Sequence, residues 1–208
     1  MAQRLNVALL AALVAGACAR KADTAPVPEP TQPLPTAGIA GQQVAVYPLT
    51  LLAAEETLGW HDALSPRRAA LDRADSLMSA LLVERSPEVQ WVLPPALRRA
   101  AARAPGMLAD PDRLATALLR APKLEQIPDP LRSQMRALNG TAADRYAFVP
   151  AALVFVRTPE GVGQAELTLV LADVRTGQLG WRTVARGEGD DPWTALQAAF
   201  KKLTPGLP

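Results

Sequence analysis

Cys18 is the only cysteine of this 208-residue chain, and it ends an apolar run near the start. A thiol can serve as a nucleophile, a metal ligand or the site of a covalent modification. Arg4 is the only charged residue ahead of Cys18, and an apolar run extends from Val7 to Ala17. This run is too short to span a bilayer, which takes roughly 20 apolar residues. A positive start, a short apolar run and small residues at its end are typical of a secretory signal peptide.

The stretch Ala15-Gly16-Ala17-Cys18 resembles the lipobox of bacterial lipoproteins, with Ala15 where that family usually has leucine. The resemblance implies that residues 1–17 are removed as a signal peptide and that Cys18 then carries a diacylglycerol and an acylated amino terminus. Several lipid chains bind a membrane firmly, because each buried methylene contributes about 0.8 kcal/mol. Ala19 stands where an aspartate tends to retain such proteins in the inner membrane, so the resemblance implies an outer-membrane anchor on the periplasmic side. The alternative is an ordinary signal peptide followed by an incidental or buried cysteine.

His61 is the only histidine, so a Ser-His-Asp hydrolase would have to use it. The surrounding stretch Gly59-Trp60-His61-Asp62 carries no nucleophile motif, and the chain has neither a P-loop nor a dinucleotide-binding glycine pattern. We therefore predict no catalytic residues, no cofactor and no enzymatic activity. An envelope hydrolase that uses His61 with a carboxylate is the alternative.

A metal site is the next possibility that the sequence raises. One histidine and one lipidated cysteine leave too few ligands for zinc. Glu188, Asp190 and Asp191 form an acidic cluster, but their spacing is not that of a calcium-binding EF-hand loop. Asp191 directly precedes Pro192, a pair that is typical of a helix start. We predict that Asp191 is a helix N-cap and that the protein has no metal site.

Tryptophan is unusually frequent among the aromatic residues, with four Trp against three Phe and two Tyr. Trp91 and Trp193 fit apolar faces of expected elements, and we predict that they lie in the core. Trp60 falls in a loop, and Trp181 and the neighbouring Arg182 fall on the return strand of an expected hairpin. Because tryptophan and arginine are enriched in protein interfaces, these three residues are the candidates for a partner-binding surface.

The charge balance argues against a nucleic-acid partner. The chain has 22 Lys and Arg against 20 Asp and Glu, and removal of the signal peptide would take Arg4 with it and leave the charge close to neutral. No run of basic residues stands out, whereas nucleic-acid binding normally needs a basic patch. Residues 18–43 are rich in proline and lack apolar periodicity, which predicts a disordered linker behind the lipidated cysteine. Residues 44–204 then form one folded domain, which has no internal disulfide because the chain has a single cysteine.

Apolar periodicity places the elements of this domain. We expect a strand over Val44–Leu52, with Pro48 at a bulge or an edge, and a short strand over Val89–Leu93. Helices are expected after Ser65-Pro66, Pro94-Pro95, Asp110-Pro111, Asp129-Pro130 and Asp191-Pro192, each begun by a capping residue or a proline. The first of these helices has Leu71, Ala74, Leu77, Met78, Leu81 and Leu82 on its apolar face and Asp75 elsewhere, and in the third Leu114, Ala117 and Leu118 are expected to be buried.

The last third of the chain changes to a period of two residues. It predicts strands over Tyr146–Val156, Gln164–Val174 and Leu179–Arg186, with a tight turn at Gly177. The whole order is β-α-β-α-α-α-β-β-β-α, an α/β fold with a single mixed sheet. Its first half is expected to be parallel and covered by helices, and its second half an antiparallel meander closed by a helix.

This order, together with several short motifs, resembles a group of bacterial envelope domains. The group comprises the curli-secretion lipoprotein family, the lipoprotein activators of penicillin-binding proteins and the amino-terminal domain of the TolB family. The most specific motif is a hairpin formed by Leu171, Asp173, Thr176, Gly177 and Trp181. Further motifs are the opening strand at 44–49, the helix at 71–82, the short strand at 89–93 and the Ala-Asp step at 143–149. Pro150 stands where these relatives usually have glycine.

The resemblance implies a non-catalytic module that binds an envelope protein or a peptidoglycan-associated component. Curli-type members also insert strands to make a pore, so a secretion-channel component is a further alternative. The chain shows no long, alternating pair of membrane hairpins, and the segment 94–139 is too helical and alanine-rich to supply them.

Overall fold

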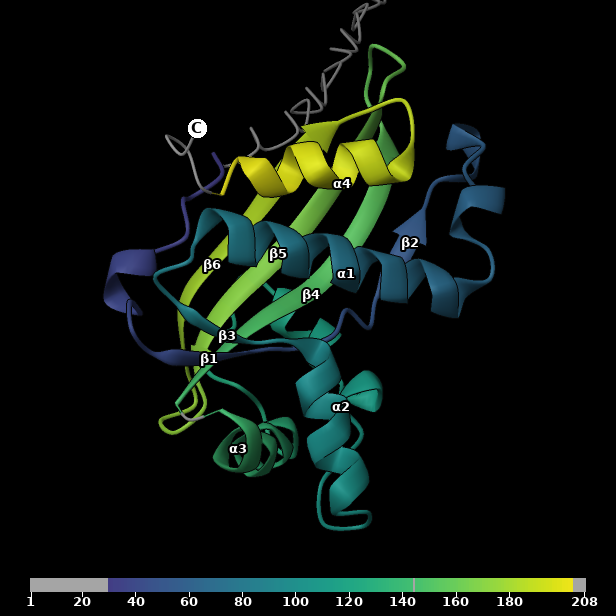
Figure 1. The fold of residues 1–208 in the computed structure, drawn as a ribbon. Helices are drawn as coiled ribbons and strands as arrows, with labels where there is room; N and C mark the ends of the chain where they lie inside the picture. Colours follow the sequence, from purple (N-terminus) through teal and green to yellow (C-terminus); the bar gives the residue numbers. More distant parts are fainter. Residues whose placement is uncertain (1–29, 144, 204–208) are drawn as a thin grey trace, which may run out of the picture.

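The computed structural model describes residues 30–143 and 145–203. A six-stranded sheet in the order β3-β1-β4-β5-β6, with β2 also paired to β4, forms the centre of the domain (Figure 1). The strands are β1 (Gln43–Val46), β2 (Leu52–Ala54), β3 (Gln90–Val92), β4 (Tyr146–Arg157), β5 (Gly163–Asp173) and β6 (Gln178–Glu188). The prediction of one α/β domain with a mixed sheet is confirmed.

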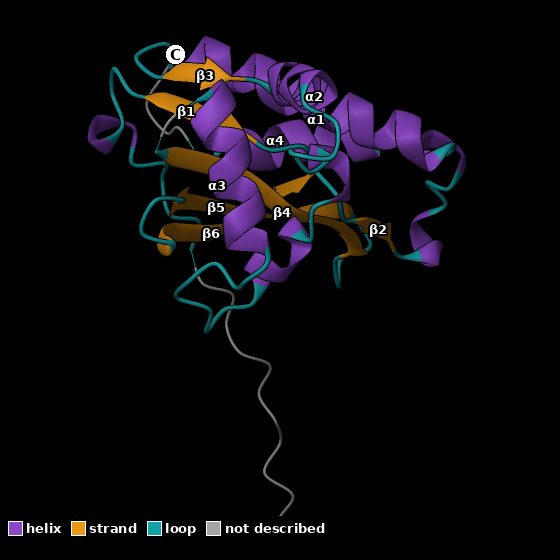
Figure 2. Cartoon of the chain, turned by 90° about the horizontal axis from the view of Figure 1, so that it is seen from below, coloured by secondary structure: helices purple, strands orange, loops and turns teal. Residues whose placement is uncertain are grey.

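The α-helices of the described residues cover the two faces of this sheet (Figures 1 and 2). They are α1 (Arg67–Arg85), α2 (Pro94–Arg103), α3 (Leu131–Ala142) and α4 (Pro192–Lys201). One apolar core lies between the sheet and α1 and α4, where Met78 and Phe200 pack with Phe148. A second core lies between the opposite face and α2 and α3, where Leu97 and Met135 are fully buried. The domain therefore has three layers.

The pairing of the strands follows the expected division into two halves. β1 pairs in parallel with both β3 and β4, whereas β4, β5 and β6 form an antiparallel meander. Gly177 supplies a φ of 84° at the β5–β6 turn, where a residue with a Cβ would be strained. The alternation of buried and half-buried residues along β5, with Leu167 and Leu169 inward, is the period that the sequence predicts.

The first expected strand is divided into two. β1 ends at Val46 and β2 begins at Leu52, yet both pair with the same edge of β4, through Val46 with Phe148 and Leu52 with Leu153. Pro48 lies in the break, where its missing N–H interrupts the ladder. The next amide, that of Leu49, donates to the Asp75 carboxylate at 2.8 Å instead of to a strand.

The predicted helix caps are correct in part. Asp191 caps α4 by accepting hydrogen bonds from the amides of Trp193 and Thr194, at 2.9 and 3.2 Å. α1, however, begins at Arg67 with Pro66 in the cap position and no side-chain cap, so the prediction that Ser65 caps this helix is wrong. The cap position belongs to Pro66, which has an extended backbone and no side-chain oxygen that could accept a hydrogen bond.

The helix expected after Asp110-Pro111 is replaced by two 3-10 turns, η4 (Pro111–Arg113) and η5 (Thr116–Arg120). Asp110 does cap the first turn by accepting from the Asp112 amide. With three residues per turn in place of 3.6, a different leucine faces the sheet. Leu119 is fully buried and Leu118 is 55% exposed, so the prediction that Leu118 is buried is wrong.

The pair Asn139-Gly140 is typical of a helix end, but α3 continues through it to Ala142. Asn139 is buried, and its amide group accepts from the Tyr47 hydroxyl at 2.7 Å and donates to the Tyr146 carbonyl at 3.0 Å. These two bonds tie the last turns of the helix to the residue after β1 and to the start of β4. The residue that resembles a helix stop is therefore a buried tertiary contact.

Part of the predicted linker lies on the domain. Thr31 donates its hydroxyl to the Val184 carbonyl at 3.2 Å, and the Leu34 amide donates to the Leu203 carbonyl at 2.9 Å. Leu34 and Ile39 are buried, at 7% and 2% exposure. The folded part therefore begins before residue 43. No helix in residues 30–143 and 145–203 has the length and hydropathy needed to cross a bilayer.

Candidate functional site

A hollow of about 520 Å³ follows the outer edge of β2. β2 reaches it from one side, and the 3-10 turns η2 (Glu56–Leu58) and η3 (Asp62–Leu64) and the start of α1 reach it from the other. It combines apolar and charged side chains on one rim, and its lining residues are Leu52, Ala53, Ala54, Glu55, Glu56, Trp60, His61, Leu64 and Arg67.

β2 presents a free strand edge to this hollow. The Leu153 amide donates to the Leu51 carbonyl and the Glu55 amide donates to the Phe155 carbonyl, so odd-numbered residues face β4. In a parallel pair the intervening residues, Leu52 and Ala54, then direct their N–H and C=O groups outward. Within the described part of the chain no other strand pairs with β2.

Arg67 occupies only part of this edge. Its guanidinium donates to the Leu52 carbonyl at 2.6 Å and to the Thr50 carbonyl at 3.3 Å. The contact ties the start of α1 to the strand and leaves the backbone of Ala54, an exposed residue, on the open part of the hollow. Exposed strand edges are templates for pairing with a further strand.

Trp60, a predicted partner-binding residue, is half-buried on the rim of this hollow. Its ring packs edge-to-face on Phe155, with centroids 5.4 Å apart and an interplanar angle of 79°. On the other side its ring lies against Gly163, where an added Cβ would overlap two ring atoms. Trp60 also lines a second hollow of about 290 Å³ that contains Val162. Trp60 thus lines both hollows. Its ring orientation is fixed by contacts with Phe155 and Gly163.

The loop that carries Trp60 is fastened to the β4–β5 hairpin by Arg157. The Arg157 amide donates to the Glu55 carboxylate at 2.9 Å, and its guanidinium donates to the carbonyls of Gly161 and Thr57. The contacts with Glu55 and Thr57 join residues about one hundred positions apart in the sequence. The rim of the hollow is therefore preorganised.

His61 lines the same hollow as Glu55 and Glu56 and is exposed. It occupies the N-cap position of η3 without a side-chain cap bond. Across the residues that the structure describes, no hydrogen bond joins its imidazole to a hydroxyl or a carboxylate. A histidine that activates a nucleophile usually lies within hydrogen-bond reach of it.

Trp181 and Arg182, the other two predicted partner-binding residues, do not lie on an open surface. Trp181 is 9% exposed and belongs to the core on the α1 and α4 side of the sheet. Arg182 donates to the carbonyls of Leu119, Pro122 and Leu124 at 3.1, 2.9 and 2.7 Å. Desolvation lowers the pKa of Arg182. Both residues are packed because elements distant in the sequence cover the two faces of β6.

The remaining candidates from the sequence are structural or lie outside the described residues. Asp191 is the α4 cap described above, and its hydrogen bonds from Thr194 and Trp193 lower its pKa. No three His, Cys, Asp or Glu side chains gather as a metal site within the described ranges. Trp193 is buried as predicted, and Trp91 is half-buried against Phe148. Cys18 and Ala19 lie outside the described residues, so the lipid anchor stays a prediction.

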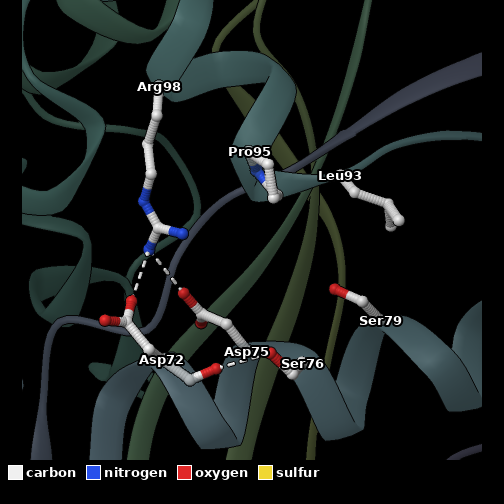
Figure 3. A pocket seen from close by; sticks show the side chains of 7 residues that line it. All are labelled: Asp72, Asp75, Ser76, Ser79, Leu93, Pro95 and Arg98. Carbon is white, nitrogen blue, oxygen red and sulfur yellow. Dashed lines mark hydrogen bonds and ion pairs between the residues drawn. The ribbon is translucent and has the colours of Figure 1, made fainter. Parts of the chain in front are cut away.

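Sequence reasoning missed an ionic cluster between α1, α2 and η4. The Arg98 guanidinium bonds the carboxylates of Asp75 and Asp112, each at 2.7 Å, and Arg68 bonds Asp72 at 2.9 Å. Figure 3 shows Arg98 reaching down from α2 toward Asp72 and Asp75 on α1, beside a hollow of about 300 Å³. The cluster links three elements of the domain.

Asp75 is the buried member of this cluster, at 4% exposure, and its position away from the apolar face of α1 did not predict this burial. Burial raises its pKa to about 6, although hydrogen bonds from the Leu49 amide and from Arg98 act in the opposite direction. At Asp112 burial also acts to raise the pKa, but hydrogen bonds from Arg98 and Arg68 outweigh it and hold the pKa below its usual value. Through Asp75, the cluster joins the β1–β2 connection at Leu49 to α1 and α2.

Comparison with known proteins gives only remote likenesses. No protein-family model matches the chain, and no curated protein matches it. A PelC dodecamer from Paraburkholderia phytofirmans superposes with a TM-score of 0.39 and 15% identity, covering 85% of this chain and 94% of that one. The LpoB C-terminal domain from Salmonella enterica gives 0.39 and 16%, covering 72% and 84%, and LpoB from E. coli gives 0.39 and 14%, covering 90% and 85%.

Proposed function

We propose that this protein is an envelope lipoprotein, anchored through Cys18 to the outer membrane and facing the periplasm, whose domain binds another envelope protein without catalysing a reaction. The anchor rests on the lipobox-like stretch at residues 15–18. The binding role rests on one observation: the free outer edge of β2 runs along the hollow beside Trp60.

The strand edge and the acidic rim of the hollow favour an extended, basic protein segment as the partner. An extended segment can add to the edge of β2 by hydrogen bonding to the backbone of Ala54, as in β-augmentation. Its alternate side chains would then enter the hollow against Trp60 and Leu64. Glu55 and Glu56 lie on the same rim, so a basic side chain in the segment is favoured. The occupant is thus an extended protein segment that carries Lys or Arg.

Substitution at Ala54 tests this mode of binding. Ala54→Pro removes the outward N–H and leaves the bonds of β2 to β4 in place, whereas Ala54→Thr retains the N–H and serves as the matched control. A photo-crosslinking amino acid at Glu56 in the full-length protein would capture the partner in intact cells. We expect a discrete crosslinked protein that persists in Ala54→Thr and is lost in Ala54→Pro. Equal crosslinking in both variants would reject pairing at this edge.

The anchor has its own test. Mass spectrometry of the mature amino terminus should find an acylated Cys18, and Cys18→Ser should release the protein from the membrane fraction. A bare thiol on the wild-type protein would remove the anchor from this proposal and leave the β2 site untouched.

The alternatives predict different results. A cell-wall ligand would be captured as crosslinked glycan in place of protein. An envelope hydrolase would lose activity on wall or ester substrates in His61→Ala, and a secretion-channel component would form rings in detergent.

A further inference from the structure

Arginines gather around a hollow of about 220 Å³ at the end of the sheet away from Trp60. β2 and the Trp60 hollow adjoin the end of β4 near Phe155, whereas this second hollow adjoins its start. Arg136 and Gly140 of α3 line one side, and Arg145, Val174 and Arg175 line the other. Figure 1 shows α3 beside the β5–β6 turn.

Two arginines of this cluster are held in place. The Arg145 guanidinium bonds the Asp173 carboxylate at 2.7 Å and lies 5.1 Å from the centre of the Tyr146 ring. Arg132 lies next to the hollow, donates to the Arg175 carbonyl at 3.1 Å and packs on the β5–β6 turn at Gly177. A Cβ at Gly177 would come within 2.7 Å of the Arg132 guanidinium, so the glycine makes room for it.

The other two arginines are available to a ligand. Within residues 30–143 and 145–203, the side chains of Arg136 and Arg175 form no hydrogen bond or ion pair, and both residues are exposed. The Asp173 carboxylate is already engaged, because it also accepts from the amides of Arg175 and Thr176 at 2.9 and 3.1 Å. Among the described residues that line the hollow, three are arginines and none is acidic, so this lining carries positive charge.

We propose that this arginine hollow, lined by Arg136, Arg145 and Arg175, binds a phosphate group. A guanidinium presents its N–H donors in a planar fork that matches phosphate oxygens in a bidentate contact. Guanidinium groups arriving from α3 on one side and from the β-strand ends on the other can contact different oxygens of one phosphate. A phospholipid headgroup at the membrane and a soluble phosphate ester offer this same group.

Calorimetric titration of the full-length lipidated protein in neutral detergent tests the proposal. The probes are inorganic pyrophosphate and short-chain phosphatidic acid, each added at low salt. The variant Arg136→Gln/Arg175→Gln should weaken binding of whichever probe binds by about tenfold or more, since it removes two guanidinium groups that can donate to phosphate oxygens. Both side chains are exposed and unbonded, so the variant should fold normally.

A matched control is Arg99→Gln/Arg103→Gln, two exposed arginines of α2 that do not line the hollow. It should leave the affinity unchanged. Tighter binding of phosphatidic acid than of pyrophosphate assigns the site to a lipid headgroup, and the reverse assigns it to a soluble phosphate. No binding of either probe, or an equal loss in the control, would overturn the proposal. None of these outcomes depends on the β2 site.

Discussion

The Asp75 carboxylate on α1 lies 2.7 Å from the Arg98 guanidinium on α2 and accepts the Leu49 amide at 2.8 Å through its other oxygen. Asp75 therefore joins two helices to the break between β1 and β2. The same break sets where β2 begins along β4, and β2 forms one wall of the Trp60 hollow. The ionic cluster thus supports the proposed partner site from a distance.

The pKa of Asp75 leads to a prediction on pH. Its folded value of about 6 lies above the unfolded value of about 3.9, so the native state binds more protons between these values. The free energy of unfolding should then decrease as pH rises from about 4 to 6.5, by an amount on the order of 2–3 kcal/mol from this group. Denaturant titrations across this range would measure the slope.

Asp75→Asn should flatten this slope because the amide does not titrate, whereas Asp72→Asn, at a carboxylate that is 45% exposed, should retain it. The lowered pKa values of Asp112 and Asp173 have the opposite sign and act below about pH 4. A wild-type stability that is flat or rising between pH 4.5 and 6.5 would contradict the prediction.

Removal of Arg98 should be costly. Arg98→Ala leaves the buried Asp75 carboxylate without its cation, and breaking such a pair costs roughly 3–5 kcal/mol. Because Arg98 is partly exposed and water can reach Asp75 after its loss, we expect about 3 kcal/mol by urea unfolding at pH 7. Arg113→Ala removes an arginine that is 87% exposed on its side chain, and it should change the free energy of unfolding by less than about 0.5 kcal/mol.

Gly163→Ala should disturb Trp60 directly. An added Cβ overlaps the Trp60 ring, so either the indole moves or the strand shifts, at a cost of about 1–3 kcal/mol. The tryptophan fluorescence and the crosslinking from the Trp60 hollow should both change. Gly140→Ala is the matched control, because nothing lies within 4 Å of its Cβ position and alanine favours a helix by roughly 0.5–1 kcal/mol. An unaltered spectrum in Gly163→Ala would argue against the close packing on Trp60.

The contact between α4 and β6 gives a further prediction. An added Cβ at Gly187 would overlap the backbone of Ala198 and Ala199, which cannot rotate away as a side chain can. Gly187→Ala should therefore destabilise the protein by about 3 kcal/mol or more, or prevent folding. At Gly180 on the same strand the nearest atom is 3.8 Å away, so Gly180→Ala should be nearly neutral in thermal unfolding. Similar melting temperatures for the two variants would contradict this packing.

The sequence predicted correctly those elements whose pattern is local. The alternation along β5, the turn at Gly177 and the Asp191 cap each depend on residues within a few positions of one another. Predictions failed where a distant partner intervenes. Asn139 resembles a helix stop, but it is buried under Tyr47, and Trp181 and Arg182 resemble a surface pair, but α4 and the segment around Leu119 cover them.

The sequence by itself determined the fold class, the order of most elements and the lipobox-like stretch at Cys18, because periodicity, caps and short motifs are properties of neighbouring residues. Only the tertiary structure decided that β1 and β2 share one edge of β4, that Asp75 is buried beside Arg98, and that Arg136, Arg145 and Arg175 surround one hollow. Each of these depends on which remote segments pack together. Packing is a property of the whole folded chain, and no short stretch of sequence encodes it.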